Sequence, residues 1–531
     1  MASPIDRRRF LTTLGLGSVA VVVSCSDDGR SGDRSETSVD GGTPEPSTVV
    51  EVATAGLAEN PFRLGVASGD PTPTSVILWT RLIVGDSLTS ELVDIPLTWE
   101  VAVDEAFGQI IGSGIVEATA QWGYSVHLDA TDLAPATEYF YRFRVDDYVS
   151  PTGRTRTAPA DDQQLDSLNI VFASCQNYAH GYYTAHDAIA ADRADAVFFL
   201  GDFIYESAGS PDSFRPFEGD EPTDLWGYRS RYELYLSDES LQRSRASAPW
   251  IVTWDDHEVE NNTAGNTSQD GITGAEFANR RAAAYAAYYE HQPLRVPPPV
   301  GPTLELYRSI RFGTLAEFFV LDGRQYRDDQ PCGDEILTSR AQCADFEVDR
   351  TMLGPDQERW IGEGLAAATT TWKVLAQQTV MSSLVIGDIV LNVDQWDGYP
   401  QARDRLLSTI VDHDIDNVVV LTGDIHSAGA GTLHTGPELA RIPVATEFVG
   451  TSITSNSLID AFPGGAEMLG QVKFEGIEYL NVVDHGYCRC TITPQQWRTE
   501  YVVVDTTVTA AAPRVDATAV VDAGTTAIRM E

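Results

Sequence analysis

Short apolar runs that each end abruptly in ionisable residues are the feature that most constrains this sequence. Such runs predict buried strands, and helical stretches such as 276–291 stand between them. The runs are "LNIVFASC" (168–175), "DAVFFLGD" (195–202), "APWIVTWDDHE" (248–258) and "NVVVLTGDIH" (417–426). Alternating strands and helices predict an α/β layered domain over 166–531, with its site at the carboxyl ends of the strands.

A different pattern precedes this domain. Residues 60–159 contain short β runs separated by turn signals, such as "SVILWTRL", "LTWEVAVD" and "EYFYRFRV", and no long helical period. This pattern predicts a small β-sandwich, and "LDATDLAPATEYFYRFRV" resembles the fibronectin type III sequence pattern. We therefore expect a small all-β domain followed by the α/β domain.

The sequence pattern at the N-terminus predicts a targeting segment. "DRRRFL" (6–11) precedes an apolar stretch, 11–23, that is too short to span a bilayer and suits a secretory signal. The arginine pair resembles a twin-arginine export signal, and "VVSC" resembles a lipobox in which Cys25 is lipidated. Simple cleavage near Cys25 is the alternative. Residues 1–25 are thus read as a signal and 26–59 as a flexible acidic linker.

The strongly negative net charge excludes some classes of binding partner. The formal net charge is -42, and lysine occurs only at Lys373 and Lys473. Such a surface repels nucleic acid and anionic lipid. We expect no nucleic-acid partner, membrane contact only through the lipid anchor, and an extracytoplasmic monomer.

The cysteines differ in their surroundings. Cys332 and Cys343 lie in a polar stretch and could pair in an oxidising compartment. Cys488 and Cys490 share one face of a predicted strand, where a bridge would be strained, so they are expected to be packed thiols. Cys175 stands alone at a strand end.

The residues at the strand ends share one property. Carboxylate, imidazole, phenol and thiol groups are all metal ligands, and carboxylates gathered at one edge repel unless a cation compensates them. A turn is the alternative for each single Gly-Asp, but several such ends together favour a metal site. The candidate ligands are Cys175, Asp202, Tyr205, Asp255, Asp256, Asp424 and His426.

Several motifs also resemble known proteins. "GDFIYE" is similar to the Gly-Asp-x-x-Tyr element of the purple acid phosphatases, which are binuclear metallophosphoesterases. From residue 60 onward the chain resembles the PhoD-like alkaline phosphatase D family, through "NPFRLGVASGDPTPTSVILWTRL", "FASCQ", "DDHEVENN", "LDGRQYR", "DQWDGYP" and "GDIHSA". The resemblance implies a layered metallophosphoesterase β-sandwich flanked by helices, and an exported alkaline phosphatase that carries Fe(III) and Ca(II).

The resemblance also implies roles for the candidate ligands. Iron would be held by Cys175, Asp202, Tyr205 and His426. Asp202 would bridge to calcium, which Asp256 and Asp424 also bind, and Asp255 would serve a second calcium or support the other ligands.

Further residues are expected to act on the substrate or to support the ligands. His257 would protonate the leaving group or contact phosphate, with Glu258 orienting it, although a structural histidine is the alternative. Arg324 would bind phosphate or form an ion pair with Asp322 or Asp328. The remaining supporting residues are Asn262 and His485, whereas His180 and His186 are read as structural.

The predicted reaction is hydrolysis of phosphate monoesters, diesters or both by a metal-activated hydroxide. A phospholipase D-like phosphodiesterase on the same site is one alternative. A cell-surface binding protein with an inactive catalytic domain is the alternative of another class.

Overall fold

The computed structural model describes residues 52–84, 93–269, 271–435, 441–457 and 474–531. The predicted signal with Cys25, and most of the predicted linker, lie outside the described residues. Within these ranges, none of the helices combines the length and hydrophobicity that a bilayer span requires.

The first large sheet has ten strands in the order β25-β24-β23-β22-β9-β10-β11-β1-β2-β5. Its centre consists of three parallel strands: β9 (Leu168–Ala173), β10 (Ala196–Leu200) and β11 (Pro249–Thr253). Antiparallel strands from the end of the chain extend one side: β22 (His485–Ile492), β23 (Gln496–Val504), β24 (Arg514–Asp522) and β25 (Ile528–Met530). The central strands are the apolar runs that the sequence marks, as expected for strands buried on both faces.

The second large sheet has the order β12-β13-β15-β18-β20-β19-β21. Four of its strands are parallel: β13 (Ala316–Val320), β15 (Trp372–Ala376), β18 (Val418–Thr422) and β20 (Ile442–Val449). Antiparallel strands complete it: β12 (Arg308–Phe312), β19 (Ala428–Thr435) and β21 (Ile477–Asn481).

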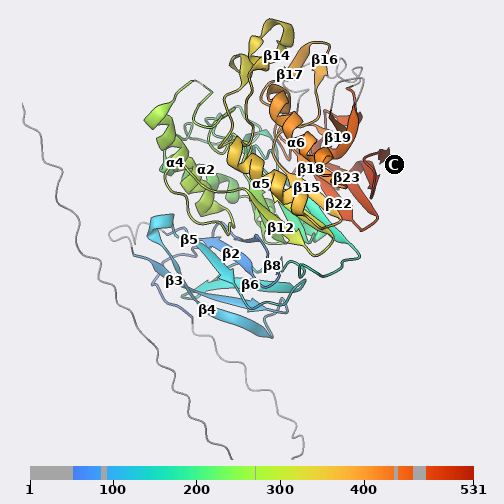
Figure 1. Cartoon of the computed structure of the whole chain (residues 1–531). Helices are drawn as coiled ribbons and strands as arrows, with labels where there is room; N and C mark the ends of the chain where they lie inside the picture. The colour runs from blue at the N-terminus through green and yellow to red at the C-terminus, as the bar shows by residue number, and fades with distance from the viewer. Residues whose placement is uncertain (1–51, 85–92, 270, 436–440, 458–473) are drawn as a thin grey trace, which may run out of the picture. The chain divides into compact units, whose positions relative to one another are not determined.

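The two sheets pack face to face around an aromatic core. The rings of Phe198 and Phe318 stack across the interface with centroids 4.4 Å apart, and Trp497 lies beside Trp372 and Phe448. Helices cover the outer faces (Figure 1). The first sheet is covered by α1 (Thr184–Asp192), α2 (Leu225–Leu236), α3 (Glu239–Arg245) and α4 (Gly274–His291), and the second by α5 (Gly354–Ala367) and α6 (Pro400–Asp412). The predicted α/β layered sandwich is therefore confirmed.

The predicted N-terminal sandwich is present, but it shares a sheet with the rest of the chain. One of its layers is β3 (Ile95–Ala102), β4 (Ile110–Ala118), β6 (Glu138–Val145), β7 (Tyr148–Val149) and β8 (Gly153–Arg156). The other layer is β1 (Val66–Gly69), β2 (Val76–Arg81) and β5 (Ser125–Ala130), and a separate apolar core lies among these strands. Because β1 pairs in parallel with β11, the ten-stranded sheet runs continuously from one region into the other.

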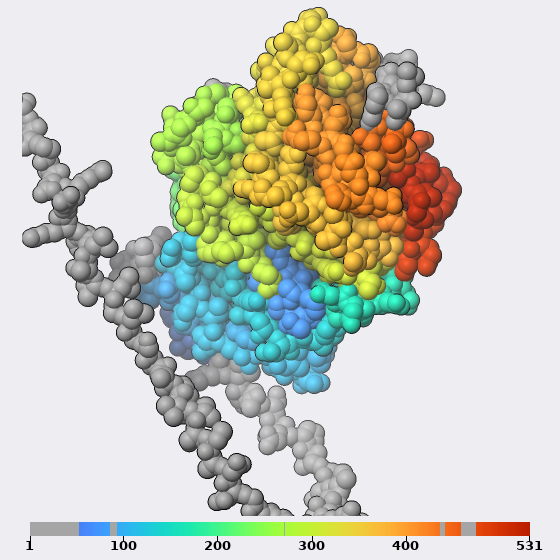
Figure 2. All heavy atoms as spheres, in the orientation of Figure 1, coloured from blue at the N-terminus to red at the C-terminus, as the bar shows by residue number. Residues whose placement is uncertain are grey.

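A small lobe stands out at the top of Figures 1 and 2. It contains β14 (Ile336–Ser339), β16 (Val385–Ile386) and β17 (Ile389–Asn392). A disulfide joins Cys332 to Cys343 beside these strands, a pairing that the sequence leaves open, while Cys488 and Cys490 are buried free thiols, as predicted. Short 3-10 helices lie at Ala120–Trp122, Tyr178–His180, Pro331–Gly333, Arg340–Gln342, Ala344–Glu347 and Trp396–Gly398.

Truncation of the inter-sheet core should destabilise the fold strongly. Trp497→Ala removes a fully buried indole between the sheets, so the free energy of unfolding should fall by about 3–5 kcal/mol in denaturant titrations. Trp226→Ala is the matched control, because this indole is 77% exposed, and its change should stay within about 0.5 kcal/mol. Similar losses for both variants would contradict the assignment of the core.

Candidate metal centre

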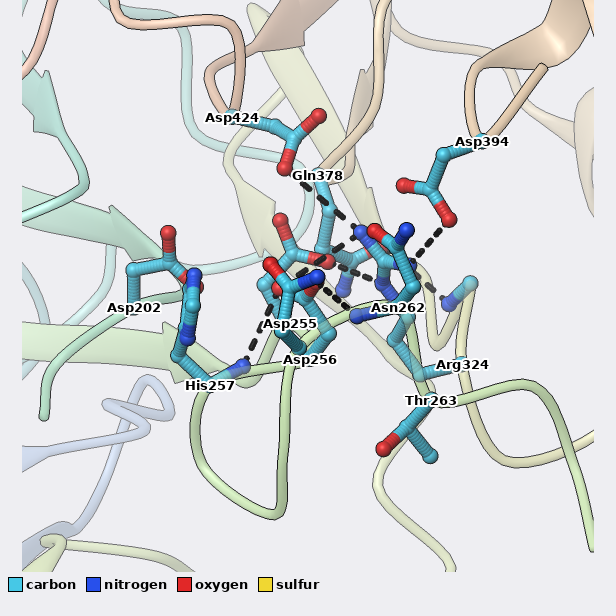
Figure 3. A network of polar contacts seen from close by, with 12 residues as sticks. Asp202, Asp255, Asp256, His257, Asn262, Thr263, Arg324, Gln378, Asp394 and Asp424 are labelled. Carbon is cyan, nitrogen blue, oxygen red and sulfur yellow. Dashed lines mark hydrogen bonds and ion pairs between the residues drawn. The ribbon is translucent and has the colours of Figure 1, made fainter. Parts of the chain in front are cut away.

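The carboxyl ends of strands from both sheets meet at one edge, and the predicted ligands gather there. Cys175 follows β9, Asp202 follows β10, Asp255 and Asp256 follow β11, and Asp424 with His426 follows β18. Figure 3 shows the carboxylates of Asp202, Asp255, Asp256 and Asp424 turned toward a common centre. One potential ligand atom from each of these four lies within 4.8 Å of the others, and the same holds for Cys175, Asp202 and His426. The structure thus brings together residues that are up to 251 positions apart, from Cys175 to His426.

The backbone at this edge is held in an uncommon conformation. Four of the candidate ligands have positive φ although none is glycine: Cys175 at 61°, Asp202 at 55°, Asp424 at 65° and His426 at 52°. A left-handed conformation costs roughly 1–3 kcal/mol for such residues, and it persists where the surrounding structure imposes it. Here it occurs just after the strands, at residues whose potential ligand atoms converge.

Two carboxylate oxygens at this edge lack hydrogen-bond partners. Asp202 Oδ1 and Asp255 Oδ2 are buried and accept no hydrogen bond from any described residue. Burial raises the pKa of Asp202, Asp255, Cys175 and Tyr205 well above their usual ranges, with neighbouring carboxylates adding to the effect. A bound cation would reverse these shifts and take up the orphaned oxygens. The residues therefore fit a metal centre.

Tyr205 and His426 are oriented as ligands would be. Tyr205 Oη donates to Asp202 Oδ2 at 2.7 Å, lies 3.1 Å from His426 Nε2, and contacts Ser455 Oγ at 2.7 Å. His426 Nδ1 lies 2.7 Å from the carbonyl oxygen of Asn456, so Nδ1 carries the hydrogen and Nε2 keeps its lone pair toward the centre. Burial lowers the pKa of His426 to about 4, which keeps the imidazole neutral.

Arg324 occupies the middle of the carboxylates (Figure 3). It is 1% exposed and bonds through Nε to Asp255 and through Nη1 to Asp394 at 2.9 Å. Its Nη2 has no hydrogen-bond partner, and lies 3.6 Å from Asp256 and 3.5 Å from Asp424. An ion pair with Asp322 or Asp328, the alternative to phosphate binding, does not form. Asp322 instead accepts the backbone N–H of Arg324 at 3.1 Å.

Glu258 does not orient His257 as the sequence suggests, and Glu206 bonds to that imidazole instead. Glu258 does not touch the imidazole of His257. Its carboxylate accepts the backbone N–H groups of Asp202, Phe203 and Asp255 at 2.7–3.1 Å. The carboxylate at His257 Nδ1 belongs to Glu206, at 2.6 Å. Glu258 thus ties the loop after β10 to the loop after β11. The sequence did not predict this role, because Glu258 is adjacent to His257 and so suggested a bond to that imidazole.

The other residues singled out in the sequence differ in their distance from the centre. Asn262 lies at the centre and donates its backbone N–H to Asp256 Oδ2 at 2.6 Å. His485 lies further out, with Nδ1 3.0 Å from Ser452 Oγ. His186 is fully buried against Gln176, as a structural histidine would be, and His180 Nδ1 accepts the backbone N–H of Asn456.

Sequence reasoning missed several residues of the centre. Asp394 holds Arg324 and also accepts from Arg327 at 2.5 Å. It stands in "DQWDGYP", two residues after the short strand β17. Gln395 beside it bonds to Asp424. Glu206 follows Tyr205 directly, and Ser455 lies in a loop after β20. The available signals were the position of Glu206 beside the Gly-Asp-x-x-Tyr element and that of Asp394 and Gln395 in the motif "DQWDGYP".

Two face-to-face sheets with these candidate ligands at their shared edge are the arrangement of a metallophosphoesterase. Two family models match the chain: "PhoD-like phosphatase" over residues 170–501, and "PhoD-like phosphatase, N-terminal domain" over residues 46–159. The chain belongs to the PhoD-like phosphatases, as the sequence resemblance predicts, and is a phosphoester hydrolase.

Individual relatives agree with this assignment. Alkaline phosphatase D of Bacillus subtilis (strain 168) is 42% identical over 471 residues, which are 85% of this chain and 79% of the relative. A solved structure described as "Structure of PhoD" superposes with a TM-score of 0.83 at 40% identity, covering 90% of this chain and 93% of the other.

Removal of the Glu258 carboxylate should loosen the metal centre. Glu258→Gln places amide hydrogens against three backbone N–H donors, so both thermal stability and bound metal should decrease, with metal affinity falling roughly 10- to 100-fold. Elemental analysis and thermal unfolding of the purified protein measure the two effects.

Glu290→Gln is the control for this experiment. Glu290 is a fully buried carboxylate bonded to Arg229, so its loss should lower stability and leave the metal content unchanged. Full metal retention in Glu258→Gln would contradict the role assigned to Glu258.

Proposed function

We propose that this chain is an extracytoplasmic alkaline phosphatase that hydrolyses phosphate monoesters, diesters or both with Fe(III) and Ca(II). The observation that carries the proposal is the convergence of a thiol, a phenol and an imidazole on the shared carboxylate of Asp202. The intact ligand set argues against an inactive binding protein.

The two halves of the centre differ in donor chemistry. Cys175, Tyr205 and His426 surround one side of Asp202, and this mixture of thiolate, phenolate and imidazole suits a redox-active iron. The other side is lined by the oxygens of Asp255, Asp256 and Asp424, which suit the hard cation calcium. Asp202 belongs to both groups and is the proposed bridging ligand.

The chain's own residues prepare the substrate for attack. When bound, metal ions of this kind lower the pKa of water and offset negative charge on phosphate. Arg324 Nη2, which has no hydrogen-bond partner, is the proposed donor to a phosphate oxygen. His257 is the proposed donor to the leaving oxygen.

The proposed iron ligation has a visible consequence. A phenolate or thiolate on Fe(III) absorbs visible light by charge transfer, so the concentrated, iron-loaded protein should be coloured. Tyr205→Phe should shift or bleach that band, and chemical reduction should do the same. The measurement is a visible absorption spectrum recorded beside an elemental analysis.

Tyr232→Phe is the matched control for the colour. Tyr232 is a buried tyrosine outside the ligand set, so its loss should leave the spectrum unchanged. A colourless, fully active protein that contains no iron would overturn the iron assignment, while the phosphatase assignment would stand.

Export and anchoring are proposed from the N-terminal residues. If Cys25 carries a lipid, Cys25→Ala should move the exported protein from the membrane fraction to the soluble fraction, because protein without acyl chains loses its anchor. Replacement of both Arg7 and Arg8 by lysine should block export, and Ser31→Ala in the linker serves as the control. Unchanged partitioning of Cys25→Ala, measured by immunoblot of the fractions, would rule out lipidation.

A further inference from the structure

Two neighbouring side chains fix the imidazole of His257, one at a ring nitrogen and one against the face of the ring. Its Nδ1 lies 2.6 Å from Glu206 Oε2, and the ring of Tyr205 lies against it with centroids 4.1 Å apart. The backbone N–H of His257 donates to Asp256 Oδ1 at 3.0 Å. With Nδ1 engaged, Nε2 is the nitrogen free to face the centre, and a ring nitrogen of His257 lies within 4.8 Å of oxygens of Asp202 and Asp256.

Glu206 is itself fixed in place. Its second oxygen, Oε1, accepts the backbone N–H of Asn261 at 2.8 Å, and the residue is 6% exposed. The guanidinium of Arg231 donates to the carbonyls of Tyr205 and Ser207, the two residues that flank Glu206. Both ends of the carboxylate and the backbone on either side of it are therefore constrained.

We propose that Glu206 is the positioning residue of His257 in the phosphate-ester hydrolysis, an inference that rests on the proposed function. Glu206 accepts the Nδ1 hydrogen and so fixes both the plane of the imidazole and the direction of Nε2. During the reaction a hydroxide, formed when a water molecule gives a proton to the solvent, bonds to phosphorus while the bond to the leaving oxygen breaks. The electron pair of that bond stays on the leaving oxygen, which takes the proton from Nε2.

No other described carboxylate is placed for this task. Glu258, the immediate neighbour of His257, is saturated by three backbone N–H groups. Glu260, in the same segment, is bonded to Arg280 and to the backbone N–H of Gln269. The segment after β10 thus supplies two metal-site residues, Asp202 and Tyr205, and the carboxylate that aims the imidazole.

The test compares esters whose leaving groups depend to different degrees on protonation. Protonation matters for alkyl and phenyl leaving groups and little for nitrophenolate, which leaves as an anion. Full-length, metal-loaded Glu206→Gln should lose on the order of 10- to 100-fold in kcat on phenyl and alkyl phosphate esters. On p-nitrophenyl esters it should lose less than about threefold. KM and metal content should stay near those of the wild type.

Further variants separate positioning from a general loss of structure. Glu206→Asp keeps the charge but withdraws the carboxylate, and should show the same selectivity for poor leaving groups. Glu206→Gln combined with His257→Ala should be no slower than His257→Ala alone, because the two residues act as a unit. Glu260→Gln is the matched control and should affect all esters equally and weakly.

Two outcomes are distinguishable. If the wild type is active and Glu206→Gln loses the same factor on every ester, or adds its loss to that of His257→Ala, the positioning role is overturned alone. If the metal-loaded wild type hydrolyses neither monoesters nor diesters, the proposed function falls, and this inference with it.

Discussion

The repulsion among buried carboxylates at one sheet edge is the constraint on which the rest of the structure depends. One potential ligand atom from each of Asp202, Asp255, Asp256 and Asp424 lies within 4.8 Å of the others. Arg324 forms ion pairs with the last three, and the imidazole of His257 lies beside Asp202 and Asp256. A single guanidinium cannot neutralise four carboxylates, and two of their oxygens stay without partners. A bound cation would take up these oxygens and relieve the repulsion, which would link metal binding to the stability of the fold.

The surrounding fold keeps these groups from moving apart. Glu258 ties the loops after β10 and β11 through three backbone hydrogen bonds, and Asp394 holds Arg324 from the opposite side. Left-handed backbone at Cys175 and Asp202 turns their side chains over the edge. The two large sheets hold these strained and mutually repelling residues in place, because the close-packed aromatic core between the sheets resists movement of the strands.

The N-terminal region contributes to the same support. Its strand β1 pairs with β11, the strand that carries Asp255 and Asp256 at its end, and Trp79 on β2 donates to the carbonyl of Glu290 on α4. It is therefore part of the structural base of the catalytic sheet. This pairing was hidden in the sequence because local alternation predicts a strand but does not identify its partner.

The sequence alone determined the strands, their buried character and the chemical types gathered at their ends, because these follow from local patterns of hydrophobicity. The candidate ligands and the layered class were predicted from it, whereas the Cys332–Cys343 disulfide was only one of two open possibilities. The tertiary structure alone decided which carboxylate serves which partner. Glu206 reaches His257 across 51 positions, Glu258 turns to the backbone, and Asp394 reaches Arg324 across 70. Spacing along the chain cannot reveal such contacts, since a side chain bonds to whatever the packing of distant loops brings within about 3 Å.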